Sequence, residues 1–249
     1  MKKLFAIIAL LLINCVFAPA QSKPIKAPSP ATAEDSATQR AEAILKLARE
    51  AKGGVEKLKQ VTDLSYSGNF VDYDQSNTSK QPFTMFLYQA KKVRTEAGAI
   101  TSGFDGGTPW INDTVQTGQV ADETRRRAIR EWFVNVLLVP SDMKMSAIAL
   151  PDSEIDGKPV TVITVEIGEY KLKISFDKQT YLMRQVSYGL MYGPNTVQLD
   201  EIQEDYRTVG GIKFAHKTIA LERGRVIGEL AITDYKINNG IDPVKFSRR

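Results

Sequence analysis

The spacing of apolar residues changes along the chain, and this change constrains the fold more than any other feature. Between about residues 37 and 61 apolar residues recur at helical spacing, whereas from Leu64 onwards, except at 122–139, they alternate with polar residues. Alternation places apolar side chains on one face of a half-buried strand. Alternating or β-branched runs lie at 64–70, 83–87, 92–97, 109–112, 143–149, 159–167, 172–176, 181–188, 196–206, 212–221 and 225–237. The sequence therefore predicts about ten strands.

Short turn signals separate nearly all of these runs. They have the residue types of hairpin connections and include Asp105-Gly106-Gly107, Asp156-Gly157, Gly193-Pro194-Asn195, Gly210-Gly211 and Arg223-Gly224. No helix of crossover length lies between consecutive strands after Pro151, and parallel neighbours would need one. We therefore expect an antiparallel sheet in sequential meander order.

Two amphipathic segments are available to cover this sheet. Residues 37–52 carry an apolar stripe at helical spacing, which Gly53 and Gly54 end, and residues 55–61 could add one short helical turn. Residues 122–139 repeat the pattern around Trp132 and Phe133, and Pro140 stops the run. One large sheet and these helices predict a single domain over 37–249.

The N-terminal segment has the features of an export signal. Two lysines precede an apolar run, and Ala18-Pro19-Ala20 supplies small residues before Gln21, so we expect residues 1–20 to be a signal peptide cleaved after Ala20. Residues 21–36 are rich in proline and predict a disordered linker. Cys15 leaves a second interpretation open, in which this cysteine is lipidated and anchors the protein to a membrane.

The composition excludes several function classes. The chain has one cysteine and one histidine, the residue types from which most metal and redox sites are built, so we expect no metal and no cofactor. Removing Lys2 and Lys3 leaves 31 basic and 29 acidic residues, a formal net charge of +2. A nearly balanced exported chain does not indicate nucleic-acid binding.

Catalytic residues are not evident from the sequence. His216 lies on a predicted strand, where a partly buried or edge histidine is the expected interpretation and a hydrolytic base is the alternative. Glu201, Glu204 and Asp205 are acidic neighbours, but a glycosidase pair would need a facing carboxylate across a cleft. Asp72, with Asp74 and Asn77, is interpreted as part of a solvated loop rather than a calcium site. We therefore expect a protein that is not an enzyme.

The densest basic cluster lies on the second helical segment, at Arg125, Arg126, Arg127 and Arg130. The acidic residues around it make a solvated helix face the expected interpretation. The functional alternative is contact with anionic lipid headgroups or with an acidic partner at a membrane surface.

The order of several short motifs resembles the periplasmic lipoprotein-carrier superfamily of LolA-like and LolB-like proteins. The resemblance extends over about residues 41–246 and implies a mainly β (α+β) fold. In this fold a large curved antiparallel half-barrel of about eleven strands carries two to three lid helices over a hydrophobic cavity for acyl chains. The motifs are AKGG at 51–54, YSGNF at 66–70, KVR at 92–94, DGGTPW at 105–110, FDKQTYLMRQV at 176–186, EDYRTVGGIKFAHK at 204–217 and ITDYKINNGIDPVKF at 232–246.

The same resemblance assigns roles to individual residues. Arg94 matches an arginine that latches the lid helices through their backbone, and Asp105, Gly106 and Trp110 match a turn whose role is structural. After this tryptophan the carriers usually have an aromatic residue and a proline, whereas here 111–114 reads INDT. We therefore keep the broader class, a periplasmic binder of lipid or acylated protein, with lipoprotein sorting as one form of it.

Alternation and amphipathicity select the residues expected to line the cavity, which are Phe83, Met85, Leu87, Trp132, Phe133, Leu172, Ile174 and Phe176. The expected partners are lipid or lipoprotein acyl chains, with transient membrane contact, and we expect a monomer. Two alternatives stay open. One is an envelope-stress regulatory module that binds a protein partner through the same fold, and the other is an unrecognised hydrolase.

Overall fold

The computed structural model describes residues 30–73, 80–192 and 195–248. Its helices are α1 (Pro30–Lys52), α2 (Val55–Lys59) and α3 (Gly118–Val136), and the short 3-10 helix η1 (Pro243–Phe246) lies near the C-terminus. The strands are β1 (Asp63–Asp72), β2 (Lys80–Tyr88), β3 (Lys92–Ala97), β4 (Ile100–Phe104), β5 (Pro109–Ile111), β6 (Thr114–Val115), β7 (Met145–Ile155), β8 (Lys158–Ile167), β9 (Tyr170–Asp177), β10 (Met183–Tyr192), β11 (Asn195–Val209), β12 (Ile212–Glu222) and β13 (Arg225–Ile237).

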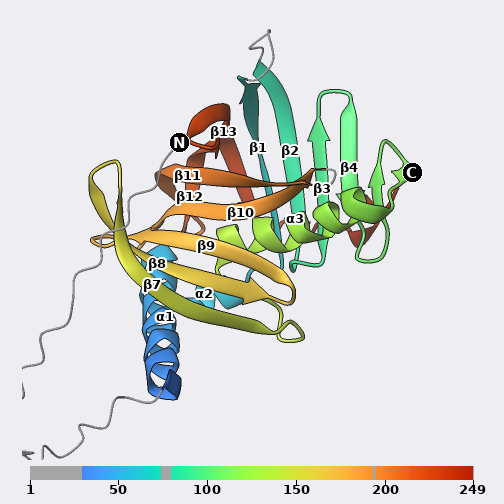
Figure 1. Cartoon of the computed structure of the whole chain (residues 1–249). Coiled ribbons are helices and arrows are strands. Elements are labelled where there is room, and N and C mark those ends of the chain that lie inside the picture. The colour runs from blue at the N-terminus through green and yellow to red at the C-terminus, as the bar shows by residue number, and fades with distance from the viewer. Residues whose placement is uncertain (1–29, 74–79, 193–194, 249) are drawn as a thin grey trace, which may run out of the picture.

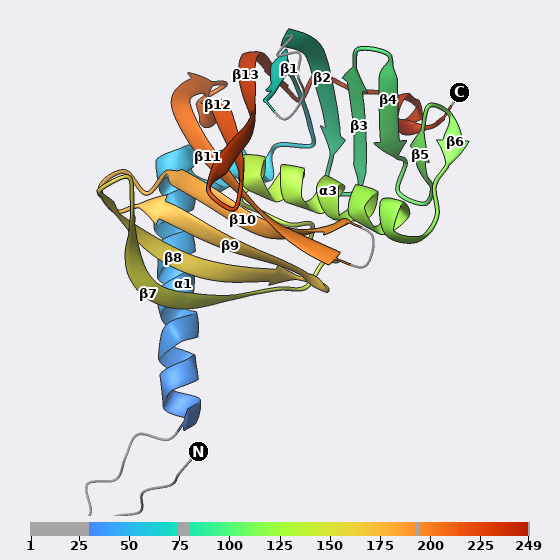
Figure 2. The same ribbon diagram turned by 45° about the horizontal axis from the view of Figure 1, so that its top comes forward.

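All thirteen described strands form one curved antiparallel sheet, which does not close (Figure 1). Its order is β6-β5-β4-β3-β2-β1-β13-β12-β11-β10-β9-β8-β7, so two sequential meanders meet where β1 pairs with β13. The connection from β6 to β7 joins the two edges of the sheet, and α3 lies in it. Figure 2 shows α3 running across the sheet between the two meanders.

Two buried clusters fill the space between the helices and the sheet. The first joins the apolar stripe of α1 and the end of α3 to β7–β10. The second joins α2 and the middle of α3 to β1–β3, β12 and β13. Helices α1 and α3 therefore cover the same face of the sheet, as their amphipathic patterns predict.

The structure confirms the predicted fold class and the meander order. The sheet has more strands than the predicted ten or so, and two short strands, β4 and β6, match no predicted run because they carry little alternation. The predicted turns at 105–107, 156–157, 210–211 and 223–224 all lie between paired strands. The pairing of β1 with β13 is the one neighbour relation that sequential order did not predict.

The helix boundaries differ from those predicted. Helix α1 begins at Pro30, so residues 30–36 of the predicted linker are helical; proline suits a first turn, where its missing N–H loses no hydrogen bond. Helix α3 covers Gly118–Val136 rather than 122–139. It ends before Pro140 because Leu137 takes a left-handed conformation (φ 56°) and its N–H bonds to the carbonyl of Phe133.

Several predictions concern residues outside the described part of the chain. These are the signal peptide with Cys15, the linker residues 21–29, the loop residues Asp74 and Asn77, and the turn at 193–194. Among the helices that the structure describes, none has both the length and the apolar character needed to cross a membrane.

Candidate ligand-binding site

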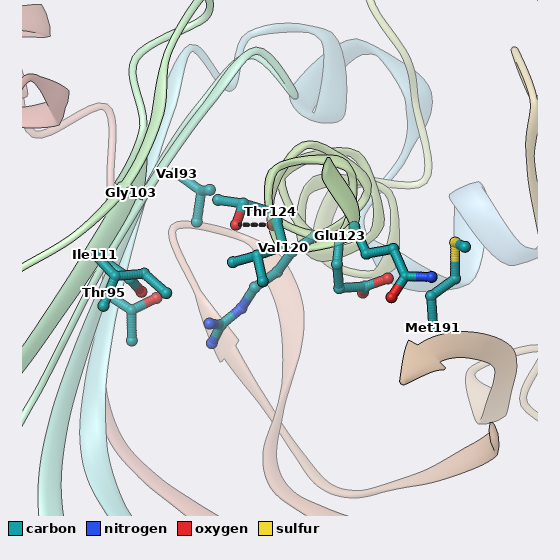
Figure 3. Close-up of a pocket in the computed structure, with 11 residues that line it drawn as sticks. Val93, Thr95, Gly103, Ile111, Val120, Glu123, Thr124 and Met191 are labelled. Atoms are coloured by element: carbon teal, nitrogen blue, oxygen red, sulfur yellow. Dashed lines mark hydrogen bonds between the residues drawn. The ribbon is translucent and has the colours of Figure 1, made fainter. Parts of the chain in front are cut away.

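The first of two cavities beside α3 has a largely apolar lining, and we call it the apolar cavity. Its volume is about 380 Å³, and it lies between the start of α3 and strands β3–β5 (Figure 3). Val93, Ile111, Val120 and Met191 supply its apolar side chains. Val120 is 45% exposed, so part of this surface is open to solvent.

The second cavity, the polar cavity, has a volume of about 310 Å³ and lies under the middle of α3. Its lining comes from α3 and from strands of both meanders, and it includes tyrosines, glutamates and amides. Glu123 and Arg127 line both cavities. The two cavities therefore adjoin along one face of α3.

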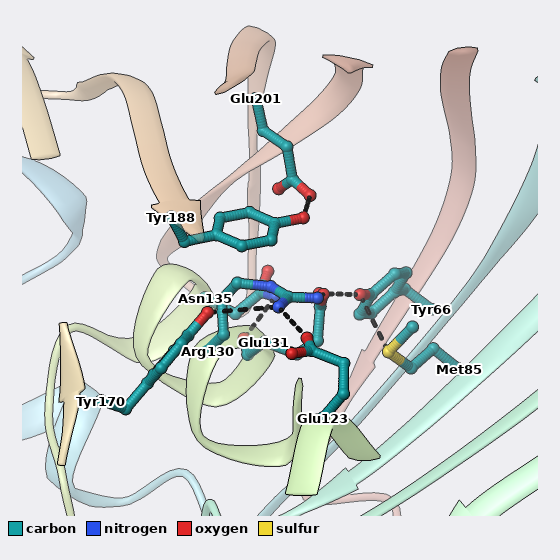
Figure 4. Close-up of polar contacts among 9 residues, drawn as sticks. All are labelled: Tyr66, Met85, Glu123, Arg130, Glu131, Asn135, Tyr170, Tyr188 and Glu201. Carbon is teal, nitrogen blue, oxygen red and sulfur yellow. Dashed lines mark hydrogen bonds and ion pairs between the residues drawn. The ribbon is translucent and has the colours of Figure 1, made fainter. Parts of the chain in front are cut away.

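Arg130 is the centre of a buried polar network in the polar cavity (Figure 4). Its side chain is 7% exposed; one terminal nitrogen donates to Glu123 Oε1 and to Tyr170 Oη, both at 3.2 Å. The other lies 3.5 Å from Glu131 Oε1, and the guanidinium stands 3.9 Å from the centre of the Tyr188 ring. A buried charge needs such partners, and these contacts tie α3 to β9 and β10.

Two tyrosine–glutamate pairs extend the network to other strands. Tyr66 Oη on β1 donates to Glu131 Oε2 at 2.8 Å, and Tyr188 Oη donates to Glu201 Oε1 at 2.6 Å. Burial, together with the negative charge of Glu131, raises the pKa of Glu201. Burial and the same glutamate raise the pKa of Tyr66. Glu201 in the polar cavity therefore keeps its proton to a higher pH than an exposed glutamate does.

Some polar groups of this site lack a partner within the described structure. Glu123 Oε2 and Arg130 Nε are buried and make no hydrogen bond with the described residues. Arg127, which is half-buried, makes no hydrogen bond or ion pair with any described residue. The Glu123 oxygen and the Arg127 guanidinium are therefore an acceptor and a donor group of this site that a ligand would complete.

The eight predicted cavity residues are all buried in the two core clusters. Phe133, Leu172, Ile174 and Phe176 pack in the first cluster, and Phe83, Met85, Leu87 and Trp132 pack in the second. Met85 also borders the polar cavity, and Trp132 borders a separate cleft beside the end of α3. The predicted strand faces are thus the inner ones, and most of the eight residues fill the core instead of lining a cavity.

Within the described residues Arg94 has no hydrogen bond to α1, α2 or α3, so its contacts differ from the lid latch that the resemblance implies. Its side chain donates to Glu96 Oε1 at 2.8 Å and to the carbonyl oxygen of Lys245 at 3.1 Å, and it stacks 5.1 Å from the Trp110 ring. The reason is strand alternation, since the neighbouring Val93 faces the apolar cavity and Arg94 faces the other side. Arg94 therefore fixes η1 against the outer face.

A different arginine contacts the backbone of α3. Arg49 of α1 donates from Nε to the carbonyl oxygen of Leu137 at 2.9 Å, at the residue that ends α3. A cationic side chain at this point satisfies a free helix carbonyl. The contact joins α1 and α3 into one cover.

The predicted turn residues Asp105 and Trp110 have structural contacts. Asp105 Oδ1 accepts from the backbone N–H groups of Gly107 and Thr108, at 2.9 and 2.7 Å. Trp110 is fully buried and donates from its indole nitrogen to the Phe246 carbonyl at 2.9 Å. The turn therefore anchors the C-terminal segment.

The four arginines of the predicted basic surface do not share one surface, because successive residues of a helix point in different directions. Arg130 is buried, and Arg127 lines the two cavities. Arg125 pairs with Asp122 at 2.7 Å and lies 6.0 Å from the Phe104 ring. A membrane-contact surface made of all four is therefore excluded.

His216 lies on β12, an interior strand of the sheet, and is more buried than the sequence predicts. Its Nδ1 lies 2.9 Å from the Ile232 carbonyl oxygen, and its ring packs edge-on to Tyr235. Its Nε2 is buried without a hydrogen-bond partner among the described residues. No hydroxyl or carboxylate nucleophile of the described residues bonds to this ring.

Sequence reasoning missed most members of the polar network. Glu123, Arg127, Arg130 and Glu131 stand at helical spacing, so their common face on α3 was a usable signal. The sequence alone favours a solvated helix face for these residues. It shows no partner for Glu201, and the fold places Glu131 in the lining of the same cavity.

The fold and the cavities together define a half-barrel in which helices cover one face of an unclosed antiparallel sheet and leave adjoining cavities beside α3. Two solved structures have this fold. An outer membrane lipoprotein-sorting protein domain from Vibrio parahaemolyticus aligns with a TM-score of 0.53 and 11% identity, over 84% of this chain and 97% of that domain. A LolA superfamily protein from Nitrosomonas europaea aligns with a TM-score of 0.52 and 13% identity, over 83% and 97% of the two chains.

These comparisons confirm the resemblance at the level of the fold. No protein-family model and no curated protein matches the chain. The function must therefore be argued from the site.

Proposed function

We propose that this protein is an exported carrier that binds lipid or the acyl chains of a lipoprotein in the adjoining cavities beside α3. One observation carries the proposal: an apolar cavity of about 380 Å³ adjoins a polar cavity of about 310 Å³, and Glu123 and Arg127 of α3 line both. Each volume falls in the range of about 300–1,000 Å³ typical of ligand sites. An apolar site joined to a polar one suits an amphipathic ligand.

The physical need for such a carrier follows from the cost of exposing acyl chains. Each CH₂ group moved from an apolar environment to water costs about 0.8 kcal/mol, so a lipid needs a cavity to cross an aqueous compartment. The N-terminal sequence supports export, and we place the protein in the periplasm. In this proposal it acts by binding and not by catalysis.

Native mass spectrometry of the gently purified protein tests the proposal. We expect lipid to copurify, and Val120→Glu to lower its occupancy at least about tenfold, because a carboxylate beside an acyl chain costs about 2–3 kcal/mol. Val226→Glu is the matched control: Val226 is 42% exposed, close to the 45% of Val120, and lies on β13 outside the apolar cavity. A folded protein that stays empty when offered lipid vesicles would contradict a carrier.

The two alternatives give different results in the same preparation. A regulatory module predicts a stable complex with an envelope protein and an empty cavity. A hydrolase predicts turnover that His216→Ala abolishes, whereas the carrier predicts that this variant still binds lipid.

A further inference from the structure

The polar cavity contains an arginine that has no counter-charge in direct contact. Arg127 lines both cavities, whereas two other arginines of α3 are paired: Arg125 lies 2.7 Å from Asp122 and Arg130 lies 3.2 Å from Glu123. Arg127 itself has no ion pair or hydrogen bond within the described ranges. A half-buried guanidinium at the junction of an apolar and a polar cavity is suited to bind an anionic group of an amphipathic ligand.

The charges of the cavity limit the net charge of that ligand. In its lining Arg127 and Arg130 lie with Glu123 and Glu131, and these four charges cancel. The fifth charged group is Glu201, which accepts the hydrogen bond of Tyr188 and whose pKa is raised by burial and by Glu131. A ligand with net charge of either sign would leave an uncompensated charge in a partly desolvated site, so a ligand that brings both charges is favoured.

Glu123 offers a place for the ligand's positive group. Its Oε1 accepts from Arg130, while its Oε2 is buried without a hydrogen-bond partner in the part of the chain described here. A buried carboxylate oxygen calls for a donor, and a cationic N–H donor forms the strongest such bond. Glu123 lines the same two cavities as Arg127.

We propose that the polar cavity selects a zwitterionic lipid headgroup, with its anionic group on Arg127 and an ammonium N–H donor on Glu123 Oε2, while the acyl chains occupy the apolar cavity. The inference rests on the proposed carrier function and names its ligand class. The proposed contacts predict different affinities for three headgroups that share the same phosphate. Phosphoethanolamine has both an anion and an N–H donor, phosphocholine lacks the donor, and phosphoglycerol lacks the cation.

The test is a set of titrations of the full mature chain with short-chain phospholipids of identical acyl length, monomeric in solution, that differ only in headgroup. We expect the phosphatidylethanolamine to bind about tenfold more tightly than the phosphatidylcholine and the phosphatidylglycerol, the size of one charge-assisted hydrogen bond. Arg127→Gln should weaken binding of the phosphatidylethanolamine about tenfold. Arg223→Gln, which removes the same charge from an exposed turn outside both cavities, should leave it unchanged.

Other outcomes overturn the inference in distinguishable ways. Equal binding of all three lipids, or no effect of Arg127→Gln, would refute headgroup selection and leave the carrier function intact. If water-soluble phosphoethanolamine bound as tightly as the lipid, the ligand would be a free zwitterion and not a lipid. If the folded protein bound none of the lipids, both the carrier function and the inference would fail.

Discussion

At the scale of single residues, Lys52 is an unusual buried cation. It is 4% exposed at the end of α1, and its amine lies 5.3 Å from the Phe214 ring and 5.8 Å from the Tyr206 ring. Burial lowers its pKa to about 7. The described residues place no carboxylate in ion-pair contact with it. The lysine therefore costs stability wherever it must carry a charge in the folded state.

We predict that Lys52→Met stabilises the protein by about 1–3 kcal/mol at pH 7. Between pH 7 and the unfolded pKa of about 10.5 the unfolded state binds more protons, so wild-type stability rises with pH in this window. The advantage of the variant should therefore shrink towards pH 10. Urea unfolding at pH 7 and pH 10 measures it, with the exposed Lys46→Met as control. If Lys52→Met gained the same unfolding free energy at both pH values, the lowered pKa of the buried amine would be refuted.

Glu201 makes the stability of the fold depend on pH in the opposite direction to Lys52. Because burial and Glu131 raise its pKa, the folded state binds more protons than the unfolded state above about pH 4.5, and stability falls as pH rises through the folded pKa. Gln at this position still accepts the Tyr188 hydrogen bond and carries no charge. We predict that Glu201→Gln equals wild type near pH 4 and is more stable at pH 8, by on the order of 1 kcal/mol. The exposed Glu42→Gln should show no such trend, and a variant less stable than wild type at pH 8 would argue that the charge is needed.

At the scale of elements, the pairing of β1 with β13 joins the two meanders, and Gly68 lies at a register shift in this pair. A Cβ at Gly68 would stand 2.0 Å from the Ala231 carbonyl oxygen and 2.8 Å from the Ile232 Cα, which are backbone atoms that cannot turn away. We predict that Gly68→Ala destabilises the fold by at least about 2 kcal/mol in chemical unfolding. Gly107→Ala, where the nearest atom is 3.7 Å away, is the control and should change stability little.

The elements also show what the sequence could predict. The bounds of strands β3 and β13 agree with the predicted ones, because β-branched residues or alternation fill both strands and a glycine follows β3 and lies beyond each end of β13. Strand β6 has only two residues, too few for a period, and the start of α3 lies before the apolar stripe that marks the helix. The polar network could not be predicted because Tyr66, Glu131 and Glu201 meet only through the folded sheet. Faces could be read from the sequence, but the contacts between distant elements could not.

At the scale of the whole molecule, α3 contacts both meanders, since Tyr66 on β1 and Tyr188 on β10 hold opposite parts of its network. The two cavities lie where these parts meet, so a ligand there contacts the helix and both halves of the sheet. Such a ligand binds only the folded state and must stabilise the whole domain by mass action.

We therefore predict that a saturating lipid, at about one hundred times its dissociation constant, adds about 2.7 kcal/mol to the unfolding free energy. For a domain of this size that corresponds to a rise in Tm of about 5–10 °C in differential scanning calorimetry. Val120→Glu should lose most of this rise and Val226→Glu should keep it, because only Val120 borders the apolar cavity. The measurement depends on burial of the ligand and not on the identity of its headgroup. An equal rise in both variants would place the bound lipid outside the apolar cavity, on another surface of the molecule.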